Sequence, residues 1–524
     1  MIKRISKVSN DKLCGEITVL LHVEMNNSFR TYRVIRIDTN EVEIEGHGNT
    51  GRFFIQGNVC GNVTISVDDL FLNDLSFIVD ARGDASQEGS VIVLKSATPH
   101  TSHILWNIIN HDISGKGIGE NESVRAIHVP CRNEYTEEAR QKRLDFIENR
   151  IGIKLPHISS TSISAERVKG NIEAFIGAIE IPVAIAGPLK INGKNAKGIF
   201  FAPMATTEGA LISSVTRGSM ALTRSGGVTT HAIWQRVTRA PVFNLETVND
   251  ALFLSDWISN NRPTIQVIIS NYSRHAEIID IDARAIGNNL HVKFIYETGD
   301  ASGQNMTTKC TWEASQWILS TFERDYPGFI RGFIIDGNMS TDKKVSYSSF
   351  INGRGIKVTA EAWIDEKILR NVLKVSKEKI LKSYHDIALG ANQCGMIGMN
   401  INISNVIAAI FTATGQDIAC VHESSLGQLF IEPVKSGIYC SMTLTNLMIG
   451  TIGGGTGLDH QKEALDIIGC YGVGKVQKFA EIIASYCLAL DMSTLAAVSG
   501  GQFVYAHESL GRNRPEHTPS VQTA

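Results

Sequence analysis

Short alternating runs of apolar and polar residues dominate the first hundred positions of the chain. Six runs have the period of two that is typical of β-strands, and Gly, Asn and Asp separate them. These runs are residues 17–25, 32–38, 41–46, 52–57, 62–67 and 91–95. The Gly- and Ser-rich stretch 113–123 that follows reads as a linker. The pattern predicts a β-rich module over residues 1–123.

Longer segments with helical spacing follow. Residues 136–150 begin with Thr and Glu, which suits a capped helix start, and residues 307–325 and 478–498 also have helical spacing. Residues 264–273 and 290–299 look like strands. We therefore expect an α+β fold in which a small α+β domain, residues 241–335, is inserted into a helix-rich domain of residues 124–240 and 336–524.

Composition narrows the class of protein. A chain of 524 residues is long enough for about two to four domains. Its 43% hydrophobic and 20% charged residues are typical of a globular protein. The formal net charge of -3 gives no general reason to expect a nucleic-acid partner.

The cysteines and the apolar runs bear on the compartment. The nine cysteines are scattered and form no Cys-x-x-Cys pair, which favours reduced, mostly buried thiols over a disulfide framework or a metal site. The basic start has no apolar core of signal-peptide length, and no uninterrupted apolar run is long enough to cross a bilayer. We expect a soluble cytoplasmic protein with no membrane partner and no metal.

The densest chemical signal is the segment 203–219, PMATTEGALISSVTRGS. One carboxylate, Glu208, stands there among small residues that let a ligand approach the backbone. The same residues also suit a capped helix start, with Glu208 in the first turn where the helix dipole favours a negative charge. The segment alone leaves both interpretations open.

Several other motifs occur in a fixed order along the chain. They are EAFIGAIEIPVAIAGPL at 173–189, DASGQNM at 300–306, DGNMSTDKK at 336–344, TGQD at 414–417, GTIGGGTG at 450–457 and AHESLGRNRP at 506–515. Some are weak alone, since a Gly-rich loop or a charge cluster is common. Together with 203–219 they resemble the hydroxymethylglutaryl-CoA reductase family over about residues 136–514, and the PMATTEG form is similar to its class I branch.

The resemblance implies a catalytic cluster of Glu208, Lys343 and Asp417, with His507 as a proton donor. An ammonium such as Lys343 can stabilise the oxyanion that hydride attack creates on a thioester. A second carboxylate nearby disfavours ionisation of both, so Asp417 can keep Glu208 protonated for the aldehyde step. A histidine suits protonation of the leaving CoA thiolate near neutral pH.

The resemblance also implies that the inserted domain is a ferredoxin-like cofactor domain that binds NADP(H). Five residues would contact the cofactor: Ser273, Arg274, Asp300, Gly303 and Asn305. Arg274 suits a 2′-phosphate because a guanidinium meets phosphate with paired donors, although it can equally be a surface arginine. NADPH is the expected cofactor, with NADH possible.

The implied reaction is the reduction of hydroxymethylglutaryl-CoA to mevalonate and CoA in the isoprenoid pathway. Substrate contacts are expected from five further residues: Ser214, Arg239, Lys344, Lys367 and Asn405. Each of them can also be an ordinary surface group. The resemblance further implies a homodimer or higher homo-oligomer with shared active sites.

The chain departs from the class I pattern at four positions. Ser302 and Gln304 stand where the family has methionines, Asn402 where it has a histidine, and Ala174 where it has an asparagine. The N-terminal module lies outside the resemblance.

Two other functions are compatible with these features. The chain can be a catalytically impaired acyl-CoA or nucleotide binder, against which the retained catalytic residues argue. Alternatively, the N-terminal module can be a ligand-sensing or docking domain that regulates the enzyme.

Overall fold

The computed structural model describes residues 129–501 throughout. In the N-terminal part it describes residues 3–4, 19–25, 28–37, 41–45, 59–67, 70–81, 91–98, 101–102 and 105. The predicted strand 52–57 and the predicted linker 113–123 lie outside the described residues. The chain divides into two compact units, Met1–Ile179 and Glu180–Ala524. The first unit thus continues past residue 123.

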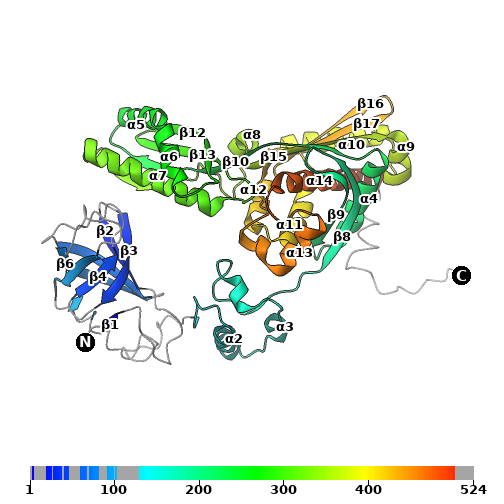
Figure 1. Ribbon diagram of the computed structural model, residues 1–524. Coiled ribbons are helices and arrows are strands. Elements are labelled where there is room, and N and C mark those ends of the chain that lie inside the picture. Colours follow the sequence, from blue (N-terminus) through cyan, green and yellow to red (C-terminus); the bar gives the residue numbers. More distant parts are fainter. Residues whose placement is uncertain are drawn as a thin grey trace. The chain divides into compact units, whose positions relative to one another are not determined.

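The first unit contains an antiparallel sheet of seven strands. The strands are β1 (Lys3–Arg4), β2 (Val19–Met25), β3 (Ser28–Ile37), β4 (Glu41–Glu45), β5 (Val59–Val67), β6 (Leu70–Ala81) and β7 (Val91–Ser96). Their order is β1-β3-β2-β5-β6-β7-β4, and β3 also pairs with β4, so that six strands form a closed ring (Figure 1). Alternate residues such as Val42, Ile44, Val63 and Ile65 are buried, as expected when each strand turns one face inward. Strand β6 was not predicted from the sequence.

The rest of the first unit is helical. It contains α2 (Glu137–Ile151), α3 (Pro156–Ser159) and the 3-10 turn η3 (Ala165–Val168). Helix α2 confirms the prediction for residues 136–150, because the Thr136 hydroxyl accepts the Ala139 N–H at 3.2 Å. The buried Arg143 of α2 donates to the carbonyl oxygens of Cys131, Glu134 and Phe175. This arginine ties the segment around residue 175 to the helix.

The second unit is built on an eight-stranded sheet and a two-stranded sheet. The larger has the order β14-β11-β13-β10-β15-β17-β16, and β12 pairs with β13. The strands are β8 (Val183–Asn192), β9 (Lys197–Ala205), β10 (Thr229–Arg239), β11 (Val242–Asn244), β12 (Glu277–Ile286), β13 (Asn289–Glu297), β14 (Gly332–Ile334), β15 (Gly355–Asp365), β16 (Gly427–Val434) and β17 (Gly437–Leu447). Strand β10 pairs with β15 along its first part and with β13 along its last three residues, so it belongs to both halves of the large sheet.

Helices cover the sheets of the second unit. They are α4 (Leu211–Arg224), α5 (Val248–Asn260), α6 (Arg262–Ser270), α7 (Gln304–Asp325), α8 (Tyr347–Asn352), α9 (Glu366–Ile368), the π-helical turn η4 (Leu369–Leu373), α10 (Lys377–Gln393), α11 (Ile403–Thr414), η5 (Ile418–Cys420), α12 (Val421–Ser424), η6 (Gly454–Gly457), α13 (Asp459–Ile467) and α14 (Val476–Gly500). The mixture of helices and antiparallel sheet confirms the predicted α+β class.

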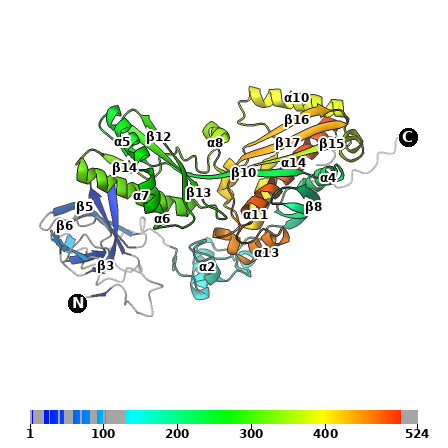
Figure 2. The same ribbon diagram turned by 45° about the horizontal axis from the view of Figure 1, so that its top comes forward.

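Residues 243–322 form a hydrophobic core separate from the main one. Figure 2 shows α5, α6 and α7 gathered with β12, β13 and β14 around it. This core supports our proposal that residues 241–335 form an inserted domain. The predicted strand 264–273 is wrong, because residues 262–270 form helix α6. Pro263 suits the first turn of a helix, and Ile265 and Ile269 are buried four residues apart on one face.

Helix α14 lies at the centre of the main core. It contacts α4, α10, α11, β15 and β17 (Figure 1), and nearly all of its residues are buried. Among the described residues, α14 alone is long and apolar enough to cross a membrane, and its burial inside the unit identifies it as a core helix. The predicted helix 478–498 is confirmed.

The cysteines only partly follow the expectation. Of the six free cysteines among the described residues, five are buried and one, Cys394, is exposed. Cys131 is disulfide-bonded, so the prediction of reduced thiols is wrong at this residue. The odd spacing of the cysteines gave no sign of that pairing.

The close contact between α4 and α14 gives a stability prediction. A Cβ atom on Gly218 of α4 would lie 1.9 Å from the carbonyl oxygen of Ala489 on α14. We expect Gly218→Ala to lower the free energy of unfolding by about 1–3 kcal/mol, because the two helices must separate. As a control, Gly390→Ala in α10, where no atom lies within 4 Å of the new Cβ, should raise it by up to about 1 kcal/mol. Urea unfolding followed by circular dichroism measures both, and equal effects would contradict the prediction.

Candidate active site

Lys343 lies in an irregular segment, residues 336–344, that follows β14. The Asp336 carboxylate organises its first half by accepting the Asn338 N–H at 2.9 Å and the Ser340 hydroxyl at 2.8 Å. The Thr238 hydroxyl of β10 donates to the Ser340 carbonyl oxygen at 2.6 Å. These bonds hold the segment against the end of β10.

Asp417 is the ion-pair partner of Lys343. The lysine Nζ lies 2.8 Å from Asp417 Oδ2, and both side chains are more than a third exposed. The other carboxylate oxygen of Asp417 accepts the Ala419 N–H at 3.1 Å and thereby caps η5. The hydrogen bond that Lys343 donates to Asp417 raises the pKa of Lys343 above its usual value. The site therefore holds a firmly protonated, solvent-accessible ammonium.

Glu208 lies in the loop between β9 and α4. The helix begins only at Leu211 after the left-handed Ala210, so Glu208 is not in the first helical turn and the capped-helix alternative is wrong. Its Oε1 accepts the Asn405 side-chain N–H of α11 at 2.9 Å, and its own N–H donates to the Thr206 hydroxyl at 3.0 Å. Glu208 is exposed. Within the described residues, no hydrogen bond or ion pair joins Glu208 to Lys343 or Asp417.

Asp491 of α14 binds the start of α11, the helix that contains Asn405. The Asp491 carboxylate accepts the N–H groups of Ile401 and Asn402 at 2.9 and 3.0 Å. Complete burial raises the pKa of Asp491 to about 7, although these two N–H groups oppose the shift. Asn402 Oδ1 is buried without a partner in the part of the chain that the structure describes. The position where the family has a histidine is therefore a half-buried asparagine here, and its Oδ1 has no hydrogen-bond partner among the described residues.

Arg239, expected to bind substrate, is 8% exposed and lies under the Lys343 segment. Its guanidinium contacts Asp342 Oδ2 at 2.9 Å and the Thr308 hydroxyl at 2.7 Å. Asp342 also pairs with Arg354 at 2.7 Å, and Arg354 pairs in turn with Glu423. Our sequence interpretation did not include Asp342, Arg354 or Glu423. Each stands among polar or small residues in the sequence, and no local pattern says that these three charges meet.

Gln304, one of the departures from the family pattern, reaches the same site. It begins α7, and its side-chain amide donates to Cys420 Sγ at 3.1 Å and to Asp417 Oδ2 at 3.4 Å. The second bond is long and weak. The Gln304 carbonyl oxygen accepts the Thr308 hydroxyl at 2.8 Å. The substituted residue therefore connects the start of α7 to Asp417 and Cys420.

The expected cofactor residues fall into two groups. The Asp300 carboxylate is used within the fold, since it accepts the N–H groups of Gly474, Lys475 and Val476 at the start of α14. Gly303 is left-handed with φ of 75°, and a Cβ there would lie 2.5 Å from Thr298.

The other three residues expected to bind the cofactor are Ser273, Arg274 and Asn305. The Ser273 hydroxyl contacts Met306 Sδ at 2.9 Å, which places the two cofactor segments side by side. Arg274 and Asn305 are exposed, and Arg274 forms no ion pair with any described residue.

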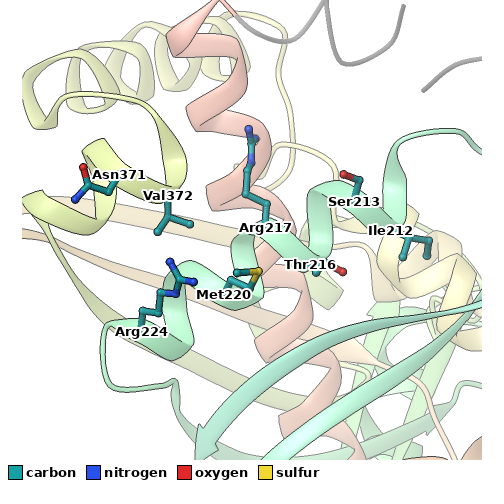
Figure 3. A pocket seen from close by; sticks show the side chains of 8 residues that line it. All are labelled: Ile212, Ser213, Thr216, Arg217, Met220, Arg224, Asn371 and Val372. Carbon is teal, nitrogen blue, oxygen red and sulfur yellow. The ribbon is translucent and has the colours of Figure 1, made fainter. Parts of the chain in front are cut away.

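A pocket of about 660 Å³ opens beside α4, which starts three residues after Glu208. Figure 3 shows its lining residues, which include Arg217, Met220 and Arg224 of α4 and Asn371 and Val372 of η4. Arg217 donates to the Ser493 hydroxyl and carbonyl oxygen of α14, and burial lowers its pKa. Ser214 contacts the same Ser493 hydroxyl at 3.0 Å. Ser214 thus shares a partner with the pocket residue Arg217 but does not itself line the pocket.

The remaining site residues lie at the edges or outside the described chain. Lys344 is exposed, and its Nζ donates to the Asp342 carbonyl oxygen at 2.9 Å. Lys367 is exposed on α9. His507 lies outside the described residues.

Comparison with known proteins decides the family. The family model described as hydroxymethylglutaryl-coenzyme A reductase matches residues 139–512. The chain belongs to the hydroxymethylglutaryl-CoA reductase family. Relatives named 3-hydroxy-3-methylglutaryl-coenzyme A reductase include that of Methanocaldococcus jannaschii, 42% identical over 71% of this chain and 93% of that one. That of Pyrococcus horikoshii is 42% identical over 71% of this chain and 92% of that one.

Solved hydroxymethylglutaryl-CoA reductases have the same fold. A reductase of Streptococcus pneumoniae matches with a TM-score of 0.51 and 19% identity, over 68% of this chain and 96% of that one. A class II enzyme from the same organism, solved with NADPH in open conformations, matches with a TM-score of 0.50, 17% identity and the same coverage. At these identities the likeness concerns the fold alone.

One departure from the hydroxymethylglutaryl-CoA reductase pattern has a visible backbone consequence. Ala174 has φ of 51°, and its N–H donates to the Arg132 carbonyl oxygen at 3.0 Å. Asparagine adopts this left-handed region more readily than alanine. Residue 174 therefore has the left-handed backbone conformation that would suit the family's asparagine, although this chain has alanine there.

The buried Asp491 predicts a specific pH dependence of stability. Its folded pKa of about 7 lies above the roughly 3.9 of an unfolded aspartate, so the folded chain binds the extra proton in between. The contribution of Asp491 to stability is therefore full below about pH 4 and is lost as the pH rises through 7. Relative to Asp491→Asn, the wild-type chain should lose on the order of 4 kcal/mol of unfolding free energy over this range.

Urea unfolding at about pH 5 and about pH 8 should show on the order of 3 kcal/mol of this loss, because the unfolded aspartate is already mostly ionised at pH 5. The exposed Asp256→Asn in α5 serves as control and should show no such change between the two conditions. A stability difference between wild type and Asp491→Asn that stays constant with pH would contradict the assignment.

Proposed function

We propose that this chain catalyses the four-electron reduction of (S)-3-hydroxy-3-methylglutaryl-CoA to mevalonate and CoA. The observation that carries the proposal is the Lys343–Asp417 pair at 2.8 Å, in motifs that match the family over residues 139–512. An ammonium held by a carboxylate, yet accessible to solvent, is available to a thioester or aldehyde oxygen. Each reduction creates negative charge on that oxygen.

Lys343 would stabilise the oxyanion of the first step. Its raised pKa keeps it protonated near neutral pH, so it offers a full positive charge rather than a neutral amine. Asp417 orients the ammonium and, through the cap of η5, is itself fixed. A preoriented charge of this kind needs no reorganisation when the reaction occurs.

Glu208 is the proposed acid of the second step, in which the aldehyde oxygen takes a proton. Asn405 orients the carboxyl through its 2.9 Å hydrogen bond. The exposed position of Glu208 lets substrate approach it directly. In the first step, His507 is the proposed proton donor to the CoA thiolate.

The residues around the start of α7 fit a dinucleotide cofactor. Arg274 is exposed and unpaired among the described residues, and Asn305 is exposed in the first turn of a 22-residue helix whose N-terminal N–H groups favour anions. When bound, NADPH supplies a hydride for each reduction. Arg274 would hold the 2′-phosphate, whereas Asp300 and Gly303 would act by shaping the loop.

The pocket beside α4 would take the CoA part of the substrate. Arg217 and Arg224 both line it, and guanidinium groups match phosphate geometry with paired donors. Helix α4 lines the pocket, and Glu208 lies three residues before the start of that helix. A bound acyl-CoA could therefore reach from the pocket toward the loop that contains Glu208. Ser214 would help to position Arg217, because both side chains hydrogen-bond to the Ser493 hydroxyl.

The carboxylate of the substrate needs a cation close to Lys343. Lys344 is adjacent and exposed, and Lys367 is a second exposed candidate. Arg239 is buried and already paired with Asp342, so we assign it to support of the segment rather than to direct contact.

We also propose a homo-oligomer with shared active sites in the cytoplasm. The β8–β9 hairpin presents four large apolar side chains to solvent, Val183, Ile185, Ile199 and Phe201, each at least 45% exposed. An apolar face of this kind marks an association surface. The buried free thiols suit a reducing compartment, whereas the Cys131 disulfide does not.

A steady-state assay tests the proposal directly. Purified protein is mixed with hydroxymethylglutaryl-CoA and either NADPH or NADH, and loss of nicotinamide absorbance is followed. We expect oxidation that requires the thioester and is faster with NADPH. Binding of the acyl-CoA without oxidation of either cofactor would instead support the catalytically impaired binder.

Replacement of Lys343 should nearly abolish turnover. We expect Lys343→Ala to lower kcat by at least about 100-fold, because removal of one oxyanion-stabilising group typically costs that much. The folded state should be preserved, since the side chain is 39% exposed. Lys379→Ala in α10, also exposed, should leave kcat unchanged. A Lys343→Ala enzyme with more than a tenth of the wild-type kcat would be inconsistent with this role.

Arg274 should decide the preference between the two cofactors. We expect Arg274→Ala to raise KM for NADPH by roughly 10- to 100-fold, the effect of losing about 1.5–3 kcal/mol of charge-assisted hydrogen bonding, and to leave KM for NADH nearly unchanged. Arg284→Ala on β12, another exposed arginine of the same unit, should affect neither. Equal changes for both cofactors would place the 2′-phosphate elsewhere.

A further inference from the structure

We propose that Glu423 and Arg354 are positioning residues for Lys343, which fix the main chain of the lysine so that its ammonium meets Asp417. The inference rests on the proposed function, in which Lys343 is the catalytic cation. Neither residue touches the solvent-accessible part of the site, since both side chains are 0% exposed. Their effect would pass entirely through the backbone of the Lys343 segment.

The backbone around Lys343 is in an unfavourable conformation. Asn338, Thr341 and Lys343 all have left-handed φ angles, of 67°, 57° and 56°. Three such residues within six positions are uncommon outside glycine, and each costs free energy relative to a right-handed or extended backbone. Contacts from outside the segment must therefore hold it in this shape.

Arg354 supplies the first of these contacts. Its guanidinium lies between two carboxylates, that of Asp342 at 2.7 Å and that of Glu423. The main-chain N–H of Arg354 donates to the Asn446 side-chain oxygen at 2.9 Å. Asp342 is the residue directly before Lys343. A guanidinium can hold two carboxylates at once because its donors form a rigid fork, so Arg354 couples the position of residue 342 to that of residue 423.

Glu423 supplies the second contact. Its Oε1 accepts the main-chain N–H of Lys343 at 3.1 Å in addition to the Arg354 bond. Its Oε2 is buried without a partner within the described chain. One oxygen of a wholly buried carboxylate therefore holds both the arginine and the lysine backbone.

Lys343 is thus held at both ends by one short stretch of chain. Glu423 in α12 binds its main-chain N–H, and Asp417, six residues earlier at the cap of η5, binds its Nζ. The turns η5 and α12 run without interruption from Ile418 to Ser424. The spacing of these two acceptors sets where the ammonium can lie.

Competitive acetylation tests this inference without relying on catalysis. Trace labelling with acetic anhydride across a pH series, read out by peptide mass spectrometry, reports how much of Lys343 is neutral. A lysine that leaves Asp417 loses the interaction that raises its pKa, so it becomes neutral, and reactive, at lower pH. Lys367 in the same molecule is the internal reference.

The main variant is the double replacement Arg354→Met/Glu423→Met. Apolar residues of similar size often replace a buried ion pair without loss of stability, so the fold should survive while the anchor is lost. We expect Lys343 labelling near pH 9 to rise by at least about threefold and kcat to fall by roughly 10- to 100-fold, as a shift of about 1 Å at a reacting group can cause. KM for both substrates should stay within about twofold.

Glu423→Gln is the second variant, because its amide oxygen still accepts both bonds but carries no charge. Its labelling and kcat should fall between those of wild type and the double variant. Glu481→Gln is the matched control: Glu481 is also a 0% exposed carboxylate that accepts main-chain N–H groups, those of Asn195 and Ala196. It should change neither Lys343 labelling nor kcat.

The outcomes separate the claims. The inference is overturned if Lys343 in the folded double variant is labelled as in the wild type. If the double variant does not fold, the same result in Glu423→Gln overturns it. A fall in kcat shared equally by Glu481→Gln overturns it as well, since it would reflect general destabilisation. A wild-type enzyme that does not oxidise NADPH refutes the proposed function instead, while the labelling still decides whether Glu423 and Arg354 position the lysine.

Discussion

The burial of helix α14 is the constraint on which the rest of the second unit depends. A helix buried along nearly its whole length must satisfy every polar side chain it carries, because an unpaired polar group in the interior is costly. Glu481, Tyr486, Asp491 and Ser493 do so by binding other segments. Glu481 binds the β8–β9 turn, and Tyr486 binds carbonyl oxygens of β8 and β9. Asp491 binds the start of α11, and Ser493 binds the pocket residue Arg217.

This arrangement explains how Glu208 and Asn405 come together from distant parts of the sequence. Glu208 and Asn405 are 197 positions apart, yet each follows a segment that rests on α14. Gly218 allows α4 to approach α14 closely, and Asp491 holds the two residues that precede α11. The second half of the site, Lys343 with Asp417, depends on a different buried centre, the Arg354 guanidinium between two carboxylates. Two buried polar centres therefore support the Glu208–Asn405 pair and the Lys343–Asp417 pair.

The sequence predicts the helices and strands that have a regular hydrophobic period, and the site residues that lie in recognisable motifs. Periodicity identified α2, α7 and α14 and five of the strands of the first unit, since each buries one face or is buried throughout. It failed for α6, because an apolar run rich in isoleucine suits a strand or a buried helix equally. Contacts between distant residues could not be predicted. No local pattern indicates that Glu423 binds the Lys343 backbone, that Gln304 reaches Asp417, or that the carboxylate of Asp300 caps α14.

The stoichiometry of a complete reaction tests the central claim most directly. After exhaustive conversion of a limiting amount of hydroxymethylglutaryl-CoA, oxidised cofactor is measured by absorbance, free CoA by thiol titration and mevalonate by mass spectrometry. The account predicts two NADPH consumed for each CoA and each mevalonate formed. Release of CoA without oxidation of cofactor, or no conversion at all by the folded protein, would contradict it.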